Sequence, residues 1–211
     1  MPEGVKNSSQ GRGQARTRLA RRAVIDAARS LFIEGGYATT TIAAISRRAD
    51  VPEPTVYRLF SSKLGILKVL FDASIAGDDE PVAVQERPNV TSLFAEPDPH
   101  KVLAGFAAVT TQINQRTNDL YSVLSRAADS DVEAAVLVGT LNQQRDRGQE
   151  QIVQALHRKQ KLRVGLKVRD AADRVHALMS PEVYRLLVTD RGWTPDRYEQ
   201  WVADTLIQQL T

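Results

Sequence analysis

The chain has 211 residues, of which 42% are hydrophobic and 25% charged, a composition typical of a globular protein and unlike that of disordered or fibrous chains. It contains no Cys, which excludes disulfides, thiolate catalysis and Cys-based zinc sites. The polar, Arg-rich N-terminus resembles neither a signal peptide nor a membrane span, so we expect a cytoplasmic protein.

The net charge of +3 is unevenly distributed. Residues 1–75 hold 12 Lys and Arg against 6 Asp and Glu, whereas residues 76–211 hold 16 against 19. A basic first third followed by an acidic remainder indicates that only the first third meets a polyanion such as nucleic acid.

The first elements in chain order are a polar arm and four helical segments. Residues 1–16 lack apolar periodicity and predict a disordered basic arm. From Thr17, apolar residues recur at helical spacing until Gly35-Gly36, which can close the helix. Two short helices follow, from the threonines at 39–41 to about Asp50 and from Pro54 to Phe60, and a fourth begins near Ser62.

The remainder reads as a connector and a helical bundle. The connector over residues 77–99 holds four prolines and six acidic residues, with room for about one helical turn over 90–95. The helices that we expect beyond it cover residues 102–117, 119–128, 131–159, 170–179, 182–188 and 195–210. The predicted fold is all-α with about nine helices: an arm (1–16), a DNA-binding domain (17–75) and a C-terminal bundle (76–211).

The segment Thr40–Lys63 is the part of the sequence that predicts function. Its two short helices each have one apolar side, so they must pack on each other and on the preceding helix. The expected core is Leu31, Phe32, Ile42, Ile45, Ala49, Val51, Val56 and Phe60. One helix is then left projecting from this core, and a projecting helix is what the DNA major groove can accommodate.

The sequence AARSLFIEGGYATTTIAAISRRADVPEPTVYRLFSSKLGIL, residues 27–67, resembles the TetR family of transcriptional regulators. It aligns without gaps to the family's helix, glycine stop, helix-turn-helix and Ser/Thr-x-Lys entry to the fourth helix. The resemblance implies a homodimer with two DNA-binding domains and a small effector bound in the C-terminal bundle.

The resemblance also implies roles for individual residues. Thr41, Tyr57 and Lys63 match phosphate-contacting positions. The residues that fall where the family reads bases are Glu53, Pro54, Thr55 and Arg58, and Thr40 and Ala43 complete the candidate DNA-binding set. The family often has Gly at the position of Pro54 and a polar reader at that of Ala43, so much of the specificity must come from elsewhere, including DNA shape.

Several of these residues also have structural interpretations. Arg58 could bind a guanine or a phosphate, and Tyr57 could be a half-buried aromatic of the small core. The remaining arginines, which could serve solubility or contact phosphates, are Arg16, Arg18, Arg21, Arg22, Arg47 and Arg48.

For the effector, the family pattern implies a site among the fourth to seventh helices. The candidates are Phe106, Ile113, Tyr121, Leu124, Leu141 and Arg145, with core packing as the alternative for each apolar residue. Arg116, Arg126 and Arg145 lie in otherwise apolar helices, and one of them could pair with an anionic effector or form a surface ion pair.

For the dimer, the family pattern implies the last two helices, here 182–188 and 196–210. Their large apolar residues are Tyr184, Leu187, Trp193, Tyr198, Trp201 and Leu206, which suit an interface or intrachain packing. A two-fold dimer would place its recognition helices about 34 Å apart and predicts a palindromic operator.

An enzyme and a protein-binding adaptor are the competing functions. The sequence shows no nucleophile with its base, no phosphate loop and no metal-ligand spacing, and His100, His157 and His176 have no partner at helical spacing. An adaptor would not need the basic first third. We therefore expect a non-enzymatic repressor that binds operator DNA, a second copy of itself and a small effector, without cofactor or metal.

Overall fold

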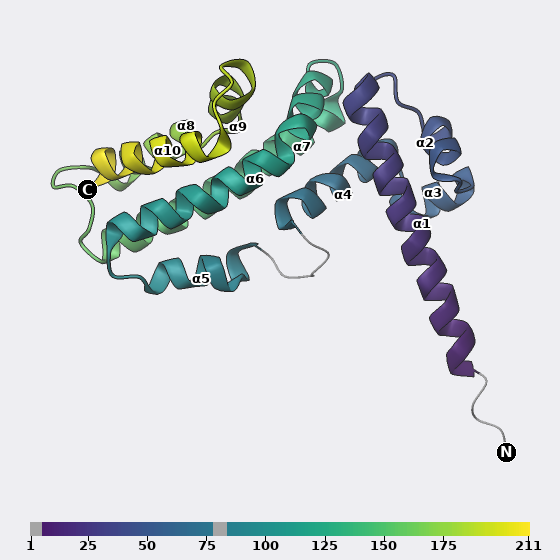
Figure 1. Cartoon of the computed structure of the whole chain (residues 1–211), viewed down its shortest axis with the longest axis horizontal. Helices are drawn as coiled ribbons and strands as arrows, with labels where there is room; N and C mark the ends of the chain where they lie inside the picture. Colours follow the sequence, from purple (N-terminus) through teal and green to yellow (C-terminus); the bar gives the residue numbers. More distant parts are fainter. Residues whose placement is uncertain (1–5, 78–83) are drawn as a thin grey trace. The chain divides into compact units, whose positions relative to one another are not determined.

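The computed structural model describes residues 6–77 and 84–211, and within them every regular element is helical. The elements are α1 (Lys6–Gly35), α2 (Ile42–Ala49), α3 (Glu53–Phe60), α4 (Lys63–Ala76), a 3₁₀ turn (Val84–Glu86), α5 (Pro88–Ala95), α6 (Pro99–Ala128), α7 (Val132–Arg158), α8 (Val168–Leu178), α9 (Pro181–Tyr184), a π-helical turn (Arg185–Asp190) and α10 (Pro195–Leu210) (Figure 1). The predicted all-α fold class is confirmed. Among these described helices, none is long and apolar enough to cross a membrane.

The chain divides into two compact units. The first comprises residues 1–72 and 122–135, and the second comprises residues 73–121 and 136–211. The expected domain boundary at residue 75 falls near the end of α4, close to the observed one. The expectation assigned residues 122–135 to the C-terminal domain, whereas the structure groups this tip of α6 and α7 with the helix-turn-helix.

The first unit is built on α1, whose buried face carries Val24, Ala28 and Phe32. The core residues that are buried as expected are Phe32, Ile42, Ile45, Val51, Val56 and Phe60, while Leu31 and Ala49 are half-buried. Tyr37, which follows the Gly35-Gly36 stop, adds a ring stacked on Phe32 with centroids 5.8 Å apart.

The N-terminus of α1 differs from the expectation. The helix begins at Lys6 and not near Thr17, so the prediction of a disordered arm is wrong for residues 6–16; residues 1–5 lie outside the described part. No proline interrupts this stretch, and its Gln, Ala and Arg residues favour helix. Extending a helix already nucleated over Thr17–Gly35 costs far less than starting one.

The turn between α2 and α3 is fixed by backbone geometry. Asp50 takes the left-handed conformation, with φ 52°, and its N–H turns back to the carbonyls at the end of α2. The Ser46 hydroxyl donates to the Val51 carbonyl at 2.6 Å, and the Val51 N–H donates to the Ser46 carbonyl at 3.1 Å. Pro52 then caps α3, whose first turn can accept Pro54 because that position needs no N–H donor.

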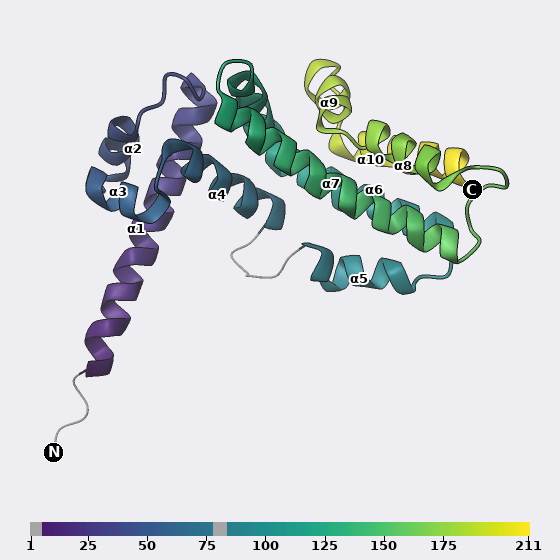
Figure 2. The same ribbon diagram turned by 180° about the vertical axis from the view of Figure 1, so that it is seen from behind.

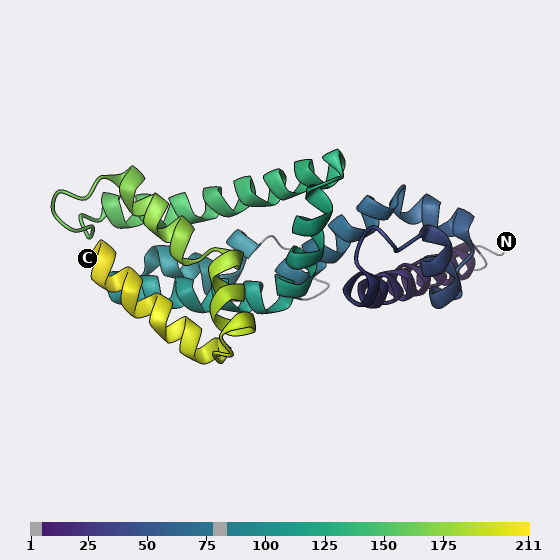
Figure 3. The same ribbon diagram turned by 90° about the horizontal axis from the view of Figure 1, so that it is seen from above.

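In the second unit, α6 and α7 are the two long helices, with α8 and α10 on one side of them and α5 on the other (Figures 1 and 2). The view from above shows α6 and α7 apart over most of their length (Figure 3). Their shared core includes Leu103 of α6, Leu156 of α7, Val175 of α8 and Leu206 of α10, all buried. Gly105 allows α5 to approach α6, since a Cβ there would lie 2.5 Å from a methyl carbon of Leu93.

Two connections in this unit differ from the expectation. The break expected between residues 117 and 119 is absent, because α6 is continuous and Thr117 returns its hydroxyl to the Ile113 carbonyl at 2.8 Å. In the connector, α5 forms two turns where one was expected, since Pro88 can occupy its first turn. Residues 78–83 lie outside the described part.

Gly65 gives a prediction about the stability of the first unit. A Cβ at Gly65 would lie 2.1 Å from the Phe60 backbone carbonyl, because α4 starts directly against the end of α3. Gly65→Ala should therefore lower the free energy of unfolding by about 1–3 kcal/mol, as overpacking does, when measured by urea denaturation. Gly139→Ala is the control: its Cβ would meet nothing within 4 Å, so stability should hold or rise. Equal stability of wild type and Gly65→Ala would contradict this account.

Candidate functional site

The α3 helix has one buried and one exposed side. Val56 and Phe60 are buried in the first unit, whereas Glu53, Pro54 and Arg58 are exposed and Tyr57 leaves half of its surface free. Thr55 is half-buried between the two sides. The residues expected to read DNA thus share the outer side of one short helix, which is the arrangement that groove binding needs.

The N-terminus of α2 is a second exposed feature. Thr41 is its N-cap, and its side-chain oxygen accepts the Ala44 N–H at 3.1 Å. The first N–H groups of a helix lack intrahelical acceptors and favour an anion. Thr41 is exposed and Ala43 half-buried, so this helix end suits the phosphate-contacting role expected for Thr41.

Thr40 differs from its neighbour in both exposure and bonding. It is 4% exposed, and its hydroxyl lies 2.8 Å from the Gly36 carbonyl and 3.2 Å from the Leu31 carbonyl. These contacts hold the loop that leads into α2 against the end of α1. The structure therefore places Thr40 in the support of the site, away from the surface that DNA would contact.

Lys63 is half-buried at the start of α4. Its ammonium donates to the Tyr37 carbonyl at 2.7 Å and lies 4.1 Å from the centroid of the Tyr37 ring. Burial lowers the pKa of Lys63, and the charge of Asp131 acts in the opposite direction. An ammonium has three donors, so a phosphate contact by Lys63 stays a prediction beside this structural role.

The arginines of the first unit divide into two groups. Arg48 is held by Glu34 of α1 through two hydrogen bonds of 2.8 and 2.9 Å, and this pair lowers the pKa of Glu34 and raises that of Arg48. Arg21 lies over the Phe60 ring at 5.0 Å. Arg16, Arg18 and Arg47 are exposed, as is Arg58, and supply the positive charge of the surface.

In the second unit, a polar cluster lies between α6, α7 and the α8–α9 region. The Tyr121 hydroxyl donates to Glu182 at 2.8 Å, and burial together with this carboxylate raises the pKa of Tyr121 to about 12. Arg145 places Nη2 at 3.0 Å from His176 Nε2 and Nη1 at 4.0 Å from Glu182. The structure thus brings together two of the expected ligand residues, Tyr121 and Arg145.

The other expected ligand residues are spread more widely. Phe106 is buried, and Ile113 and Leu141 are half-buried, all in the second unit. Leu124 is buried in the residues grouped with the first unit. Core packing, the alternative interpretation of these apolar residues, accounts for Phe106 and Leu124 in the described structure.

Sequence reasoning missed several members of the polar cluster. His176 has a carboxylate partner, Asp146 at 2.5 Å, and its Nδ1 is also 3.3 Å from the Gln149 amide oxygen. Both partners come from α7, so spacing along α8 could not reveal them. The available signal was on α7 itself, where Asn142, Arg145 and Gln149 share one side at helical spacing.

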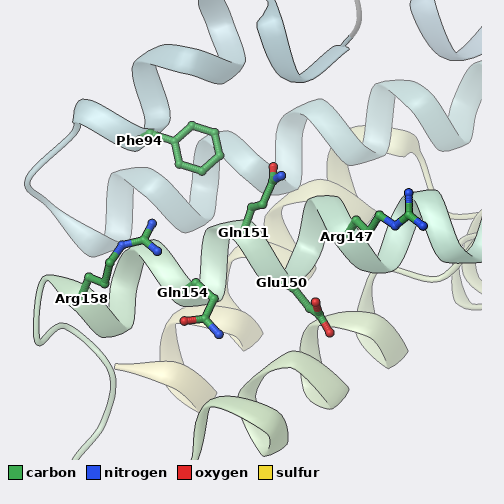
Figure 4. A pocket seen from close by; sticks show the side chains of 6 residues that line it. All are labelled: Phe94, Arg147, Glu150, Gln151, Gln154 and Arg158. Carbon is green, nitrogen blue, oxygen red and sulfur yellow. The ribbon is translucent and has the colours of Figure 1, made fainter.

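The opposite side of α7 borders an open groove of about 490 Å³. It is lined by Phe94, Arg147, Glu150, Gln151, Gln154 and Arg158, and Figure 4 shows five of these side chains along α7 and Phe94 projecting from α5. Five of the six lining residues are charged or are glutamines, and none of the six is among the ligand residues expected from the sequence.

The expected dimer residues separate into two groups. Tyr184, Tyr198 and Leu206 are at most 2% exposed and belong to the core of the second unit, and the Tyr198 hydroxyl donates to the Leu178 carbonyl at 3.2 Å. Intrachain packing therefore explains these three. Leu187, Trp193 and Trp201 are half-buried, and an interface role for them stays a prediction.

No group of three or more His, Asp or Glu side chains that could hold a metal ion occurs in the part of the chain that the structure describes. The features above are a short capped helix, a tight turn and a second short helix with one exposed side. They give the first unit a helix-turn-helix, an arrangement typical of DNA-binding domains.

Residues 24–70 match the family model of the bacterial regulatory proteins, tetR family. This match covers the helix-turn-helix and part of the helix before it, and it bears out the resemblance seen in the sequence. A comparison with curated protein sequences finds no match.

The whole fold is similar to those of several regulators of known structure. The fatty acid degradation regulator FadR from Bacillus halodurans is 17% identical, with a TM-score of 0.69 over 89% of this chain and 94% of its own. FadR from Bacillus subtilis in complex with stearoyl-CoA is 18% identical, with a TM-score of 0.67 over 90% and 99%. NalD from Pseudomonas aeruginosa, the secondary repressor of the MexAB-OprM multidrug efflux pump, is 20% identical, with a TM-score of 0.68 over 91% and 96%.

The hydrogen bonds of Thr40 give a prediction that distinguishes a structural role for this residue from a contact with DNA. Thr40→Val should lower the free energy of unfolding by about 1 kcal/mol or more, because it removes the buried hydroxyl that donates to the Gly36 carbonyl and also lies 3.2 Å from the Leu31 carbonyl. Thr39→Val is the matched control, since the hydroxyl of Thr39, which donates to Gly35, is exposed and water can replace it. Urea denaturation measures both variants; an effect of Thr39→Val as large as that of Thr40→Val would contradict the assignment.

Proposed function

We propose that the protein is a transcriptional repressor that binds a palindromic operator as a homodimer and is released by a small-molecule effector. The observation that carries this proposal is the exposed outer side of α3, which bears Tyr57 and Arg58 in a unit whose sequence is strongly basic. Such a helix can enter the major groove while the N-terminus of α2 meets the backbone.

The homodimer is supported by the half-buried aromatic residues of the last helices. Trp193 and Trp201 meet edge to face at 6.0 Å, and Arg197 lies over the Trp193 ring at 4.0 Å. Leu186, in the π-helical turn before these residues, keeps 52% of its surface exposed. Aromatic side chains and arginine are enriched where proteins associate, so this surface suits a second copy of the chain.

Release by an effector is supported by the polar cluster of the second unit. Arg145 is mostly buried and Gln149 is 3% exposed, and burying such polar groups is costly for a bundle that serves packing alone. NalD is described as a repressor and the B. subtilis FadR structure contains stearoyl-CoA, which is consistent with repression and effector binding on this fold.

Selection from random duplexes tests the central proposal. The full chain should enrich an inverted repeat with half-site centres about one helical turn, or 34 Å, apart, because a two-fold dimer presents two α3 helices. Sedimentation at micromolar concentration should give a dimer. Enrichment of a single half-site by a monomer would overturn the homodimer, and absence of any enriched sequence would favour a protein-binding adaptor.

Arg58 and Tyr57 provide a contrast between base reading and phosphate binding. Arg58→Ala should weaken binding to the selected operator by about 1–3 kcal/mol while changing random-DNA binding much less, if the guanidinium reads a base. Tyr57→Phe should weaken binding to both DNAs by a similar factor, because a phosphate contact carries no sequence information. Fluorescence anisotropy at fixed salt measures both.

The control for these variants is Arg126→Ala, which removes an exposed arginine of α6 whose Nε donates to its own helix at Ser122. It should leave DNA binding unchanged. Equal losses of Arg58→Ala on operator and random DNA would assign Arg58 to phosphate.

A further inference from the structure

Arg145 differs from the two other arginines in the apolar stretches of α6 and α7. Arg116 donates to the carbonyls of Ser74 and Ile75, at 2.8 and 3.0 Å, and Arg126 is exposed. The Arg145 side chain keeps only 18% of its surface and lies inside the polar cluster. It is therefore the candidate for an interior interaction with a ligand.

Some of the N–H donors of Arg145 have no hydrogen-bond acceptor. Nη2 faces His176, but Nε and Nη1 are buried without a hydrogen-bond acceptor among the residues that the structure describes. Glu182 lies 4.0 Å from Nη1, which is an ionic contact too long for a hydrogen bond. Buried donors are nearly always paired, so these two indicate an acceptor supplied from outside the chain.

Gln149 and Thr111 extend this set of unpaired groups. Gln149 is 3% exposed; its Oε1 faces His176, whereas its Nε2 has no acceptor in the described residues. It lies one turn after Arg145 on the same side of α7. Thr111 of α6, 2% exposed, likewise has a buried hydroxyl without a partner among them.

The charges around Arg145 define the kind of acceptor that fits. Glu182 accepts the Tyr121 hydroxyl and Asp146 pairs with His176, so both nearby carboxylates have partners of their own. The N–H groups of a guanidinium make their strongest hydrogen bonds with ionised acceptors, so the unpaired Nε and Nη1 favour an anion although Glu182 is already in ionic contact. Two carboxylates in the same cluster repel a doubly charged phosphate more strongly than a singly charged group, which makes the singly charged group the better match.

We infer that the effector carries a carboxylate, which accepts hydrogen bonds from Arg145 and from the Gln149 amide. This inference rests on the proposed function, in that the second unit binds a small effector. The carboxylate replaces the distant Glu182 as the acceptor for Arg145, and Glu182 keeps Tyr121.

The test uses the full chain without DNA and straight-chain carboxylates from butanoate to dodecanoate, each beside the primary amide and the amine of the same length. Thermal shift and calorimetry should show binding by acids of suitable length, with the matching amide about tenfold weaker or worse and the amine without effect. Amides that bind as tightly as acids, or no binding across the series, would overturn the inference.

Two variants locate the site. Gln149→Glu supplies an internal carboxylate for Arg145, so it should fold, should raise the melting temperature of the free protein and should abolish acid binding. Arg145→Met keeps the aliphatic stem and should weaken acid binding at least about tenfold, whereas Arg126→Met should bind like wild type. Wild-type affinity in Gln149→Glu would refute the assignment.

The outcomes distinguish a failure of this inference from a failure of the proposed function. If acids bind but operator affinity is unchanged, release by the effector fails and the carboxylate site stands. If operator binding and dimerisation are found but no acid binds, the carboxylate inference fails and the regulator stands.

Discussion

The contact of Lys63 with Tyr37 is the interaction on which the geometry of the DNA-binding unit depends. Tyr37 stacks on Phe32 of α1, and Lys63 at the start of α4 binds both its carbonyl and its ring. One residue in the loop before α2 thus ties α1 to α4, and α2 and α3 lie between these two helices in the sequence. Burial raises the pKa of Tyr37 and lowers that of Lys63, and the charge of Asp131, between α6 and α7, adds to the first shift and opposes the second.

Positive charge in the first unit serves two purposes that the sequence does not distinguish. Arg48 and Lys63 are directed to partners within the unit, and Arg21 lies over Phe60, so these residues hold helices together. Arg47 and Arg58 are exposed. Fewer basic side chains are therefore free to meet a polyanion than the number of basic residues implies.

The sequence predicted the helix-turn-helix well because its signals are local. Gly35-Gly36, the Thr41 cap and Pro52 each act through neighbouring backbone, and the apolar spacing identified Val56 and Phe60. What it could not predict depends on contacts distant in sequence. Thr40 and Thr41 look alike until the fold directs one hydroxyl to Gly36, and the partner of His176 comes from another helix. The length of α1 was missed because a helix extends by propagation beyond its amphipathic part.

Arg116 has a consequence for the end of α4. Its guanidinium caps the carboxyl end of α4 at Ser74 and Ile75, and Gly77, with φ 81°, leaves room for it, since a Cβ there would lie 3.0 Å from the guanidinium carbon. Residues from outside the helix thus contact both of its ends: Arg116 of α6 at the last turn and Tyr37 at the first. The carboxyl end of α4 therefore depends on a donor from another helix, because the last C=O groups of a helix lack donors within it.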